Sequence, residues 1–233
     1  HEIYVCAGNC LRGVVLTAAE MGAQRRFSTI TIKENNVLDG DMERLLIDGV
    51  TDILTRLPSL PPAVLVYTSC IHHFLGCDLA LCYRELRSRF PGVDFTDCYM
   101  NPIMRKSGLT PDQLMRKQLY SLLKPRAQDL GVNLLGNCYE TDDTSELVKI
   151  IRLAKRPLRD ITQCRTYEDY QNMAASTLHI AYNPPAKVGG QTLADRLGGT
   201  FLYLPLSYTP QVIRKNLQTL CTALDVTYDP AED

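Results

Sequence analysis

The sequence predicts an α/β protein made of two units, each with a parallel sheet flanked by helices. Short runs of β-branched and aromatic residues alternate along the chain with helix-length amphipathic segments, an order typical of parallel sheets. Pro102 and Gly108 interrupt this alternation near the middle of the chain. We therefore expect an interdomain connection at 101–110 and two domains, 1–105 and 106–233.

Seven segments have the composition expected of strands. The first is a short apolar run at residues 3–5. Val, Ile, Thr, Phe and Tyr, which fit the pleated surface of a sheet, are frequent in the other six. These six segments are 27–32, 63–68, 93–98, 132–136, 178–182 and 200–204.

Helix-length segments lie between the strands. One is expected to begin near Leu11. Among the later ones, the segment 111–123 has a clear start signal. Thr110 is a good N-cap, Pro111 suits the first helical position, and Gln113 completes a capping box. The helices expected after the first one are 41–57, 78–90, 111–123, 144–154, 187–197 and 210–224.

Composition and charge exclude several classes of protein. The 25 Lys and Arg residues nearly balance the 26 Asp and Glu residues, giving a net charge of −1, which argues against nucleic-acid binding as the main function. A chain that is 45% hydrophobic and 22% charged is not intrinsically disordered. The uncharged stretch 57–77 contains three prolines and two histidines, so we expect no membrane helix there. The chain opens on His1 without a signal-peptide pattern, and we expect it to be a fragment.

The nine cysteines are an odd number in a chain of this size, which argues against a disulfide framework. The first group is Cys6 and Cys10, between the first strand and the helix that follows it. Thiols near a helix N-terminus are favoured as thiolates, the form that binds metals. The alternative is that the two are small buried hydrophobic residues.

The second group follows the strand 63–68, where open α/β sheets bind their ligands. It contains Cys70, His72, His73 and Cys77. Adjacent residues on a helix do not share a face, so an alternative for the histidines is that one is packed and the other solvated. For Cys77 we expect core packing.

The spacing of the thiols favours iron over zinc. Structural zinc sites use two tight pairs, and only Cys6 with Cys10 has that spacing. Iron–sulfur clusters accept thiolates from separate loops and sometimes from two subunits. Cys138 follows the strand 132–136, and we expect it to be packed. No glycine-rich phosphate-binding motif is present.

Several segments, in this order, resemble the nitrogenase component 1 family. The cysteine loop at 6–10 resembles the family's Gly-x-x-Gly-Cys loop, and 34–43 resembles a segment that precedes a long helix. The loop at 68–78 resembles its Cys-x-x-x-x-x-Gly-x-Asp loop, and 131–136 its Val-Asn-Ile-Ile-Gly strand. A strand and helix at 177–198 extend the resemblance over nearly the whole chain.

The resemblance implies a fold, a cofactor and its ligands. The fold would be two Rossmann-like units of a three-domain subunit, with the third domain missing here. Cys10 and Cys70 match the family's cluster ligands, while Cys6 would be an additional ligand. The cofactor would be an iron–sulfur cluster of the 4Fe-4S type or larger. The family's other cluster cysteine lies upstream of this segment.

One departure bears on the substrate. In nitrogenase the strand matching 178–182 leads into a cysteine that holds the iron–molybdenum cofactor, whereas here Tyr182, Asn183 and two prolines follow. The resemblance therefore implies an oxidoreductase acting on a substrate other than dinitrogen, with a further metallocofactor or a tetrapyrrole possible.

The function expected is that of a cytoplasmic, nitrogenase-like oxidoreductase subunit that relays electrons from an ATP-dependent iron–sulfur reductase. It would pair with an identical or homologous subunit, and no nucleic acid or membrane is expected as a partner. His73 is the candidate catalytic residue, as a proton donor beside the cluster. The alternatives are a scaffold for assembling a metallocofactor and a non-catalytic α/β binding module whose thiols are only packed.

Overall fold

The chain forms two compact units, His1–Gln118 and Leu119–Asp233. A computed structural model describes residues 1–101 and 108–229. The expected domain border between residues 105 and 106, like most of the connection at 101–110, lies outside the described residues. That border stays a prediction.

The first unit contains a four-stranded parallel sheet. Its spatial order is β2-β1-β3-β4, so β1 and β3 are neighbours although β2 lies between them in sequence. Val5 of β1 lies between Ile30 of β2 and Thr68 of β3 in the ladder. The strands are β1 (Glu2–Ala7), β2 (Phe27–Ile32), β3 (Ala63–Ser69) and β4 (Asp94–Met100).

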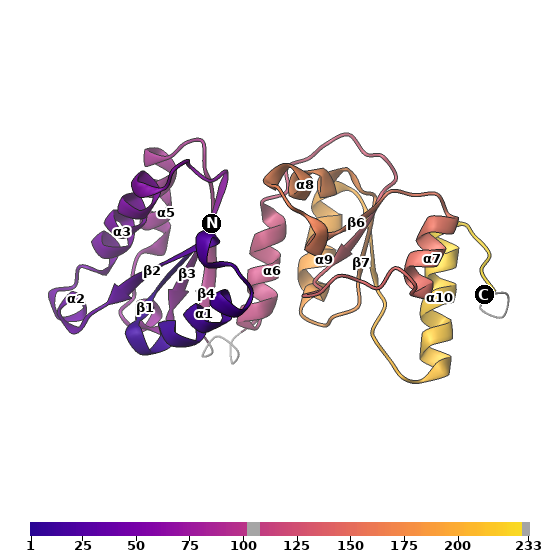
Figure 1. Ribbon diagram of the computed structural model, residues 1–233, viewed down its shortest axis with the longest axis horizontal. Coiled ribbons are helices and arrows are strands. Elements are labelled where there is room, and N and C mark those ends of the chain that lie inside the picture. Colours follow the sequence, from indigo (N-terminus) through magenta and orange to yellow (C-terminus); the bar gives the residue numbers. More distant parts are fainter. Residues whose placement is uncertain (102–107, 230–233) are drawn as a thin grey trace. The chain divides into compact units, whose positions relative to one another are not determined.

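Helices α3 and α5 lie side by side against this sheet (Figure 1). They supply most of the helical side chains in its core. Leu46 and Val50 of α3 and Leu86 of α5 are fully buried against Val5 and Val64 of the sheet. The helices in or adjoining this unit are α1 (Gly8–Glu20), α2 (Glu34–Asp39), α3 (Met42–Arg56), α4 (Cys70–Phe74), α5 (Leu79–Arg89) and α6 (Pro111–Ser121), with a 3₁₀ turn, η1, at Gln24–Arg26.

The second unit repeats this topology. Its four parallel strands have the order β6-β5-β7-β8, again with a crossover that makes the first and third strands neighbours in the middle of the sheet. The strands are β5 (Val132–Leu135), β6 (Leu158–Asp160), β7 (Leu178–Ala181) and β8 (Thr200–Tyr203).

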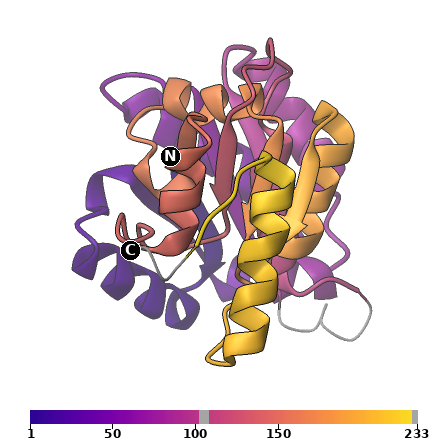
Figure 2. The same cartoon turned by 90° about the vertical axis from the view of Figure 1, so that its right-hand side faces the viewer.

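Helices cover both faces of the second sheet. Leu134 and Ile180 pack with buried residues of α7 and α10, which lie side by side in Figures 1 and 2. Leu135 and Ala181 point to the other face and pack with α9 and α8. The helices are α7 (Glu146–Leu153), α8 (Tyr167–Asn172), α9 (Ala186–Leu197) and α10 (Pro210–Leu224), with 3₁₀ turns η3 (Ile161–Gln163) and η4 (Met173–Ala175).

The capping box expected at the start of α6 is present. The Thr110 N–H donates to Gln113 Oε1 at 2.9 Å, and the Gln113 N–H donates to Thr110 Oγ1 at 3.3 Å. These two bonds satisfy backbone groups that a helix start leaves unpaired, which explains why the helix begins at Pro111.

The α/β class and the parallel sheets are confirmed, and the differences are local. The first helix begins at Gly8 rather than near Leu11. Strand β6 was not expected, because its three residues, Leu158–Asp160, are too few to show an alternating pattern. Within the described residues, no helix is long and apolar enough to cross a membrane.

Candidate functional site

The topology of the first sheet brings the two cysteine loops to one place. The chain leaves β1 toward β2 on one side and returns to β3 on the other, so the direction of winding reverses between β1 and β3. Open α/β sheets bind ligands at such a switch point, outside the carboxyl ends of the two strands. Here Cys6 is the penultimate residue of β1, and Cys10 lies in α1, the helix that follows β1. Cys70 directly follows β3.

The three thiols differ in exposure. Cys6 is the penultimate residue of β1 and has no exposed surface, while Cys10 is exposed in the first turn of α1. Cys70 is half-buried as the first residue of α4, with Ser69 as the N-cap. Two of the three sulfurs are therefore within reach of a group bound at the sheet edge.

The three thiols interact electrostatically. Burial, followed by the charges of Cys10 and Cys70, raises the pKa of the Cys6 thiol to about 11. Coulomb interactions of this kind weaken with distance, so Cys10 and Cys70 both lie close to Cys6. We name Cys6, Cys10 and Cys70 the cysteine edge.

The cysteine edge fits part of an iron–sulfur site. Across the described part of the chain, no three His, Cys, Asp or Glu side chains are arranged to hold a single metal ion. A cluster makes a different demand, because each thiolate binds a different iron, and a cluster held by cysteines alone takes four of them. Cys10 and Cys70 offer two accessible thiol donors at one sheet edge, which suits part of such a group, whereas Cys6 is fully buried behind them and further ligands would come from elsewhere.

Cys77 is not part of this edge. It packs against the hydrophobic core of the first unit, as expected. Burial is the main cause that raises the pKa of the Cys77 thiol, and the charge of Glu43 is the second cause. Its electrostatic neighbour is thus an acid on α3 rather than another thiol of the edge.

The two histidines have opposite environments. His72 is only 2% exposed, and its Nδ1 accepts a hydrogen bond from the Ser69 N–H at 3.2 Å. Burial lowers the pKa of His72, so the ring is neutral at pH 7. His73 is exposed, with its ring centroid 6.2 Å from that of Phe74. The structure therefore matches the alternative in which one histidine is packed and the other solvated.

His72 and His73 both line a cavity of about 290 Å³ beside the second cysteine loop. Thr68 and Ser69 of β3, Tyr99 of β4 and Asn101 also border it. The sequence drew attention to His73, yet the buried member of the pair is His72. Only a burial pattern over the short helix α4 would have distinguished them, and five residues are too few to give one.

Glu43 is a structural residue of the site that the sequence did not single out. Its Oε1 accepts a hydrogen bond from the Asp78 N–H at 2.8 Å, which ties α3 to the end of the second cysteine loop. Asp78 in turn caps α5 by accepting from the Leu81 N–H at 2.9 Å. These bonds fix the loop at its far end from Cys70.

The matching edge of the second sheet is held by amide and hydroxyl groups. Asn183 Nδ2 donates to the Gly136 carbonyl at 3.2 Å, joining the loops that follow β7 and β5. The buried Asp160 carboxylate accepts from Asn137 Nδ2 at 2.8 Å and from the Thr141 N–H at 3.1 Å. This edge therefore has a network of amide, hydroxyl and carboxylate groups.

The prediction that Cys138 is packed is wrong. It follows β5, but its side chain is exposed rather than packed. Its strand ends at Leu135, and the loop that begins at Gly136 carries it away from the sheet core. Sequence alone did not show where this strand ends.

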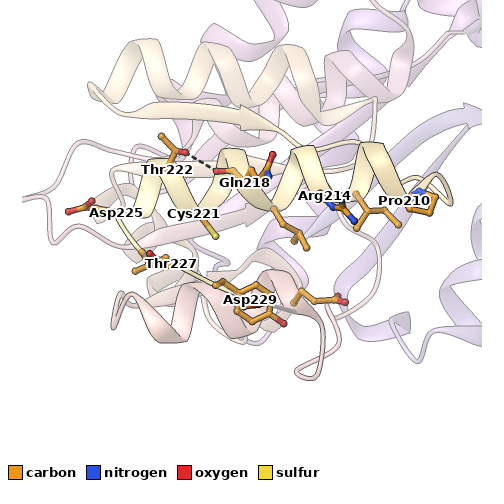
Figure 3. A pocket seen from close by; sticks show the side chains of 13 residues that line it. Pro210, Arg214, Gln218, Cys221, Thr222, Asp225, Thr227 and Asp229 are labelled. Carbon is orange, nitrogen blue, oxygen red and sulfur yellow. Dashed lines mark hydrogen bonds between the residues drawn. The ribbon is translucent and has the colours of Figure 1, made fainter. Parts of the chain in front are cut away.

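A larger cavity, of about 1170 Å³, lies along α10 in the second unit (Figure 3). Its labelled wall residues include Arg214, Gln218 and Cys221 of α10 and Asp229 of the segment that follows. Among the described residues that line it, no three metal-binding side chains come together, and it is not at the switch point of its sheet. We therefore place the candidate site at the cysteine edge.

The fold and the site define an α/β protein with two doubly wound units, the first carrying thiols at its switch point. The chain belongs to the nitrogenase component 1 type oxidoreductase family, whose model matches residues 13–232. The matched residues include Cys70 and His72, whereas Cys6 and Cys10 precede them.

Two solved structures show the same fold. One, described as nitrogenase Cp1 at pH 6.5, has a TM-score of 0.71 and 14% identity, covering 99% of this chain and 55% of its own. The other, nitrogenase Cp1 at pH 5, has a TM-score of 0.68 and 15% identity, covering 98% of this chain and 48% of its own. The chain thus spans about half the length of these structures. A comparison with curated proteins gave no match.

Proposed function

We propose that this chain is an oxidoreductase subunit that binds an iron–sulfur cluster at the cysteine edge. The observation that supports this most directly is the position of Cys10 and Cys70, in the first turns of the helices that follow adjacent strands at the switch point. Both also act electrostatically on the buried Cys6. Cys10 and Cys70 are the proposed ligands, with Cys6 as an additional one.

The residues of the edge bind and shield the cluster. A bound cluster supplies one-electron transfer, at a potential set by hydrogen bonds to its sulfurs and by exposure to solvent. Cys10 lies in the first turn of α1, where backbone N–H groups have no partner within the helix. Cys6, with its raised pKa, is protonated at pH 7 and would release that proton on binding metal.

We propose an identical or homologous subunit as the source of the missing ligand. The exposed apolar residues next to Cys70 support this. Phe74 is 69% exposed and Leu75 is 44% exposed, both at the end of α4. A second chain that covered them would also exclude water from the cysteine edge.

Electrons would come from an ATP-dependent iron–sulfur reductase and go to a substrate other than dinitrogen. The proposal that the substrate is not dinitrogen follows from Tyr182 and Asn183. These residues stand where nitrogenase is expected to lead into a cofactor cysteine. His73 stays the proposed proton donor, because its exposed ring is open to solvent and to a docked substrate. Reduced thiols and a cluster suit the cytoplasm.

Anaerobic reconstitution with iron and sulfide tests the proposal. The wild-type chain should turn brown and retain iron after gel filtration, and Cys10→Ser and Cys70→Ser should each lose most of it. Cys138→Ser is the matched control, since Cys138 is also exposed but lies in the second unit. Equal iron in all four proteins would contradict the assignment of Cys10 and Cys70 as ligands, and no retained iron in any of them would favour a binding module that holds no cluster.

A second assay separates an enzyme from an assembly scaffold. Cluster-loaded protein that turns over substrate only with the reductase and ATP would support the enzyme. Transfer of the intact cluster to an acceptor protein, without turnover, would support the scaffold.

A further inference from the structure

The first sheet has an edge strand, β2, whose outer side is unpaired among the described residues. The strand order β2-β1-β3-β4 makes β2 and β4 the two edges (Figure 1). In residues 1–101, all of which are described, the backbone of 27–32 is hydrogen-bonded to β1 and to no other segment. An edge strand of this kind presents a row of N–H and C=O groups that can pair with a further strand.

The other edge strands of the two described sheets carry features that hinder such pairing. Strand β4 contains Asp94 and Asp97, and Arg87 Nη2 donates to the Phe95 carbonyl at 3.1 Å. Strand β6 has only three residues and β8 only four, and Pro205 follows shortly after β8. Charges, proline and short length are the usual means by which proteins protect the edges of their sheets.

Strand β2 has none of these protections. Its six residues, Phe27–Ile32, include no charged residue and no proline. Ile30 and Ile32 are buried in the core of the first unit, whereas Thr29 and Thr31 are exposed. Since β-branched residues fit a pleated surface and alternation fixes which side chains face the core, β2 is suited to receive a neighbouring strand.

Positive charges stand at both ends of β2. Arg25 and Arg26 precede the strand and Lys33 follows it, and all three side chains are exposed. No ion pair joins any of the three to another described residue, although most ion pairs of the described chain use arginine. The one acid in this stretch is Glu34, so the segment 25–34 is net positive.

These charges disfavour a second copy of β2 as the neighbour. An antiparallel pair of β2 strands would place Arg26 opposite Lys33 of the copy, and a parallel pair would place the two Arg26 side chains next to each other. Like charges directly opposite one another destabilise a strand pair. A segment with acidic residues at both ends would meet opposite charges in either orientation.

We propose that β2 binds an extended segment of a partner protein by strand addition, and that this segment has Asp or Glu at both ends of a β-branched stretch as long as β2. Main-chain hydrogen bonds supply the affinity, and Arg26 and Lys33 select the acidic ends. The inference goes beyond the proposed oxidoreductase function and uses none of the cysteine edge. Its test has no iron readout, so the two proposals can fail separately.

The probe is the fluorescently labelled peptide Asp-Asp-Thr-Val-Thr-Val-Thr-Val-Asp-Asp, and a second peptide has Lys in place of every Asp. Fluorescence anisotropy of each peptide is measured against the full chain, prepared free of iron. The acidic peptide should bind saturably and more weakly as salt is raised. The Lys peptide should bind at least about tenfold more weakly.

Backbone methylation tests strand addition itself. Alternate residues of an added strand direct their N–H groups toward β2, and the others direct them away. N-methylation of all the valines, or of all the threonines, removes one set of donors. One methylated peptide should therefore bind at least about tenfold more weakly than the other, because several hydrogen bonds are lost. Equal affinities of the two methylated peptides would overturn strand addition.

Two charge reversals locate the contact. Arg26→Glu should weaken binding of the acidic peptide by about fivefold to tenfold, because an attraction becomes a repulsion. Arg84→Glu changes the net charge equally, but Arg84 is exposed on α5, which packs on the β4 side of the sheet, so affinity should change little. Equal weakening in the two variants would show that net charge, and not β2, attracts the peptide.

Two results with the wild-type chain alone would overturn the proposal. One is the absence of saturable binding by the acidic peptide. The other is an iron-free dimer that the acidic peptide dissociates, since β2 would then be covered by a second copy of this chain. Analytical ultracentrifugation with and without the peptide distinguishes that case.

Discussion

Asn133 Nδ2 donates a hydrogen bond to His179 Nδ1 at 2.9 Å, linking the adjacent strands β5 and β7 inside the second sheet. Both side chains have no exposed surface. The same Asn133 amide donates to the Met173 carbonyl at 2.8 Å. His179 Nδ1 therefore accepts, and the ring is held in the neutral form.

This pair predicts a loss of stability in mild acid. Burial lowers the pKa of His179 to about 4, from 6.5 in an unfolded chain. Below pH 6.5 the unfolded chain binds a proton that the folded chain does not, so the free energy of unfolding falls as the pH drops and levels off below about 4. The total contribution is about 3 kcal/mol.

Urea unfolding of wild type and His179→Asn between pH 4 and 7 measures this effect. Asn offers an acceptor near the Nδ1 position but does not titrate, so its stability should depend less on pH. Parallel curves for wild type and His179→Asn would show that His179 is not responsible.

Gly136 is predicted to tolerate no side chain. Its φ is +80°, and an added Cβ would lie 2.2 Å from Cβ of the buried Ala186 on α9. Gly136→Ala should lower the free energy of unfolding by about 3 kcal/mol, combining backbone strain with overpacking. Gly198 is the matched control: its φ is +78°, but the nearest atom to an added Cβ is Gln128 Nε2 at 3.9 Å. Gly198→Ala should cost only about 1 kcal/mol, and equal losses in the two variants would rule out the contact with Ala186 as the cause.

The proposed roles of Cys70 and His73 predict different defects. Cys70→Ala should abolish cluster binding, because it removes a ligand. His73→Ala should keep the iron and lower turnover by about a hundredfold to ten-thousandfold, the range for losing a general acid. Iron content by elemental analysis, measured beside turnover with the reductase, separates the two. Equal loss of iron in both variants would mean that His73 is itself a ligand.

Association is predicted to depend on the exposed end of α4. Phe74→Asp adds a charge to an apolar side chain that is 69% exposed, so it should weaken pairing without disturbing the core. Sedimentation of cluster-loaded protein should show a dimer or a complex for wild type and a larger monomer fraction for the variant. Val212→Asp, on α10 in the other unit, is a control, since Val212 is 36% exposed. A wild-type protein that is monomeric with its cluster bound would contradict the pairing.

The fold class and most of the elements could be predicted from the sequence alone. β-branched runs mark strands because those side chains fit a pleated, half-buried surface, and residues 27–32 match β2 to the residue. Thr110 and Gln113 marked the start of α6 through local hydrogen bonds. The order of cysteine loops was enough to indicate the family that the matched residues 13–232 confirm.

Which side chains come together in space depends on the tertiary structure. That Cys10 and Cys70 share an edge follows from the crossover that places β3 beside β1, and strand order depends on long-range packing rather than on local pattern. That His72 rather than His73 is buried follows from how the short helix α4 lies on the first unit, because neighbouring helical residues point about 100° apart and five residues show no periodicity. Local preferences thus fix the elements, whereas contacts between residues distant in sequence fix which side chains meet.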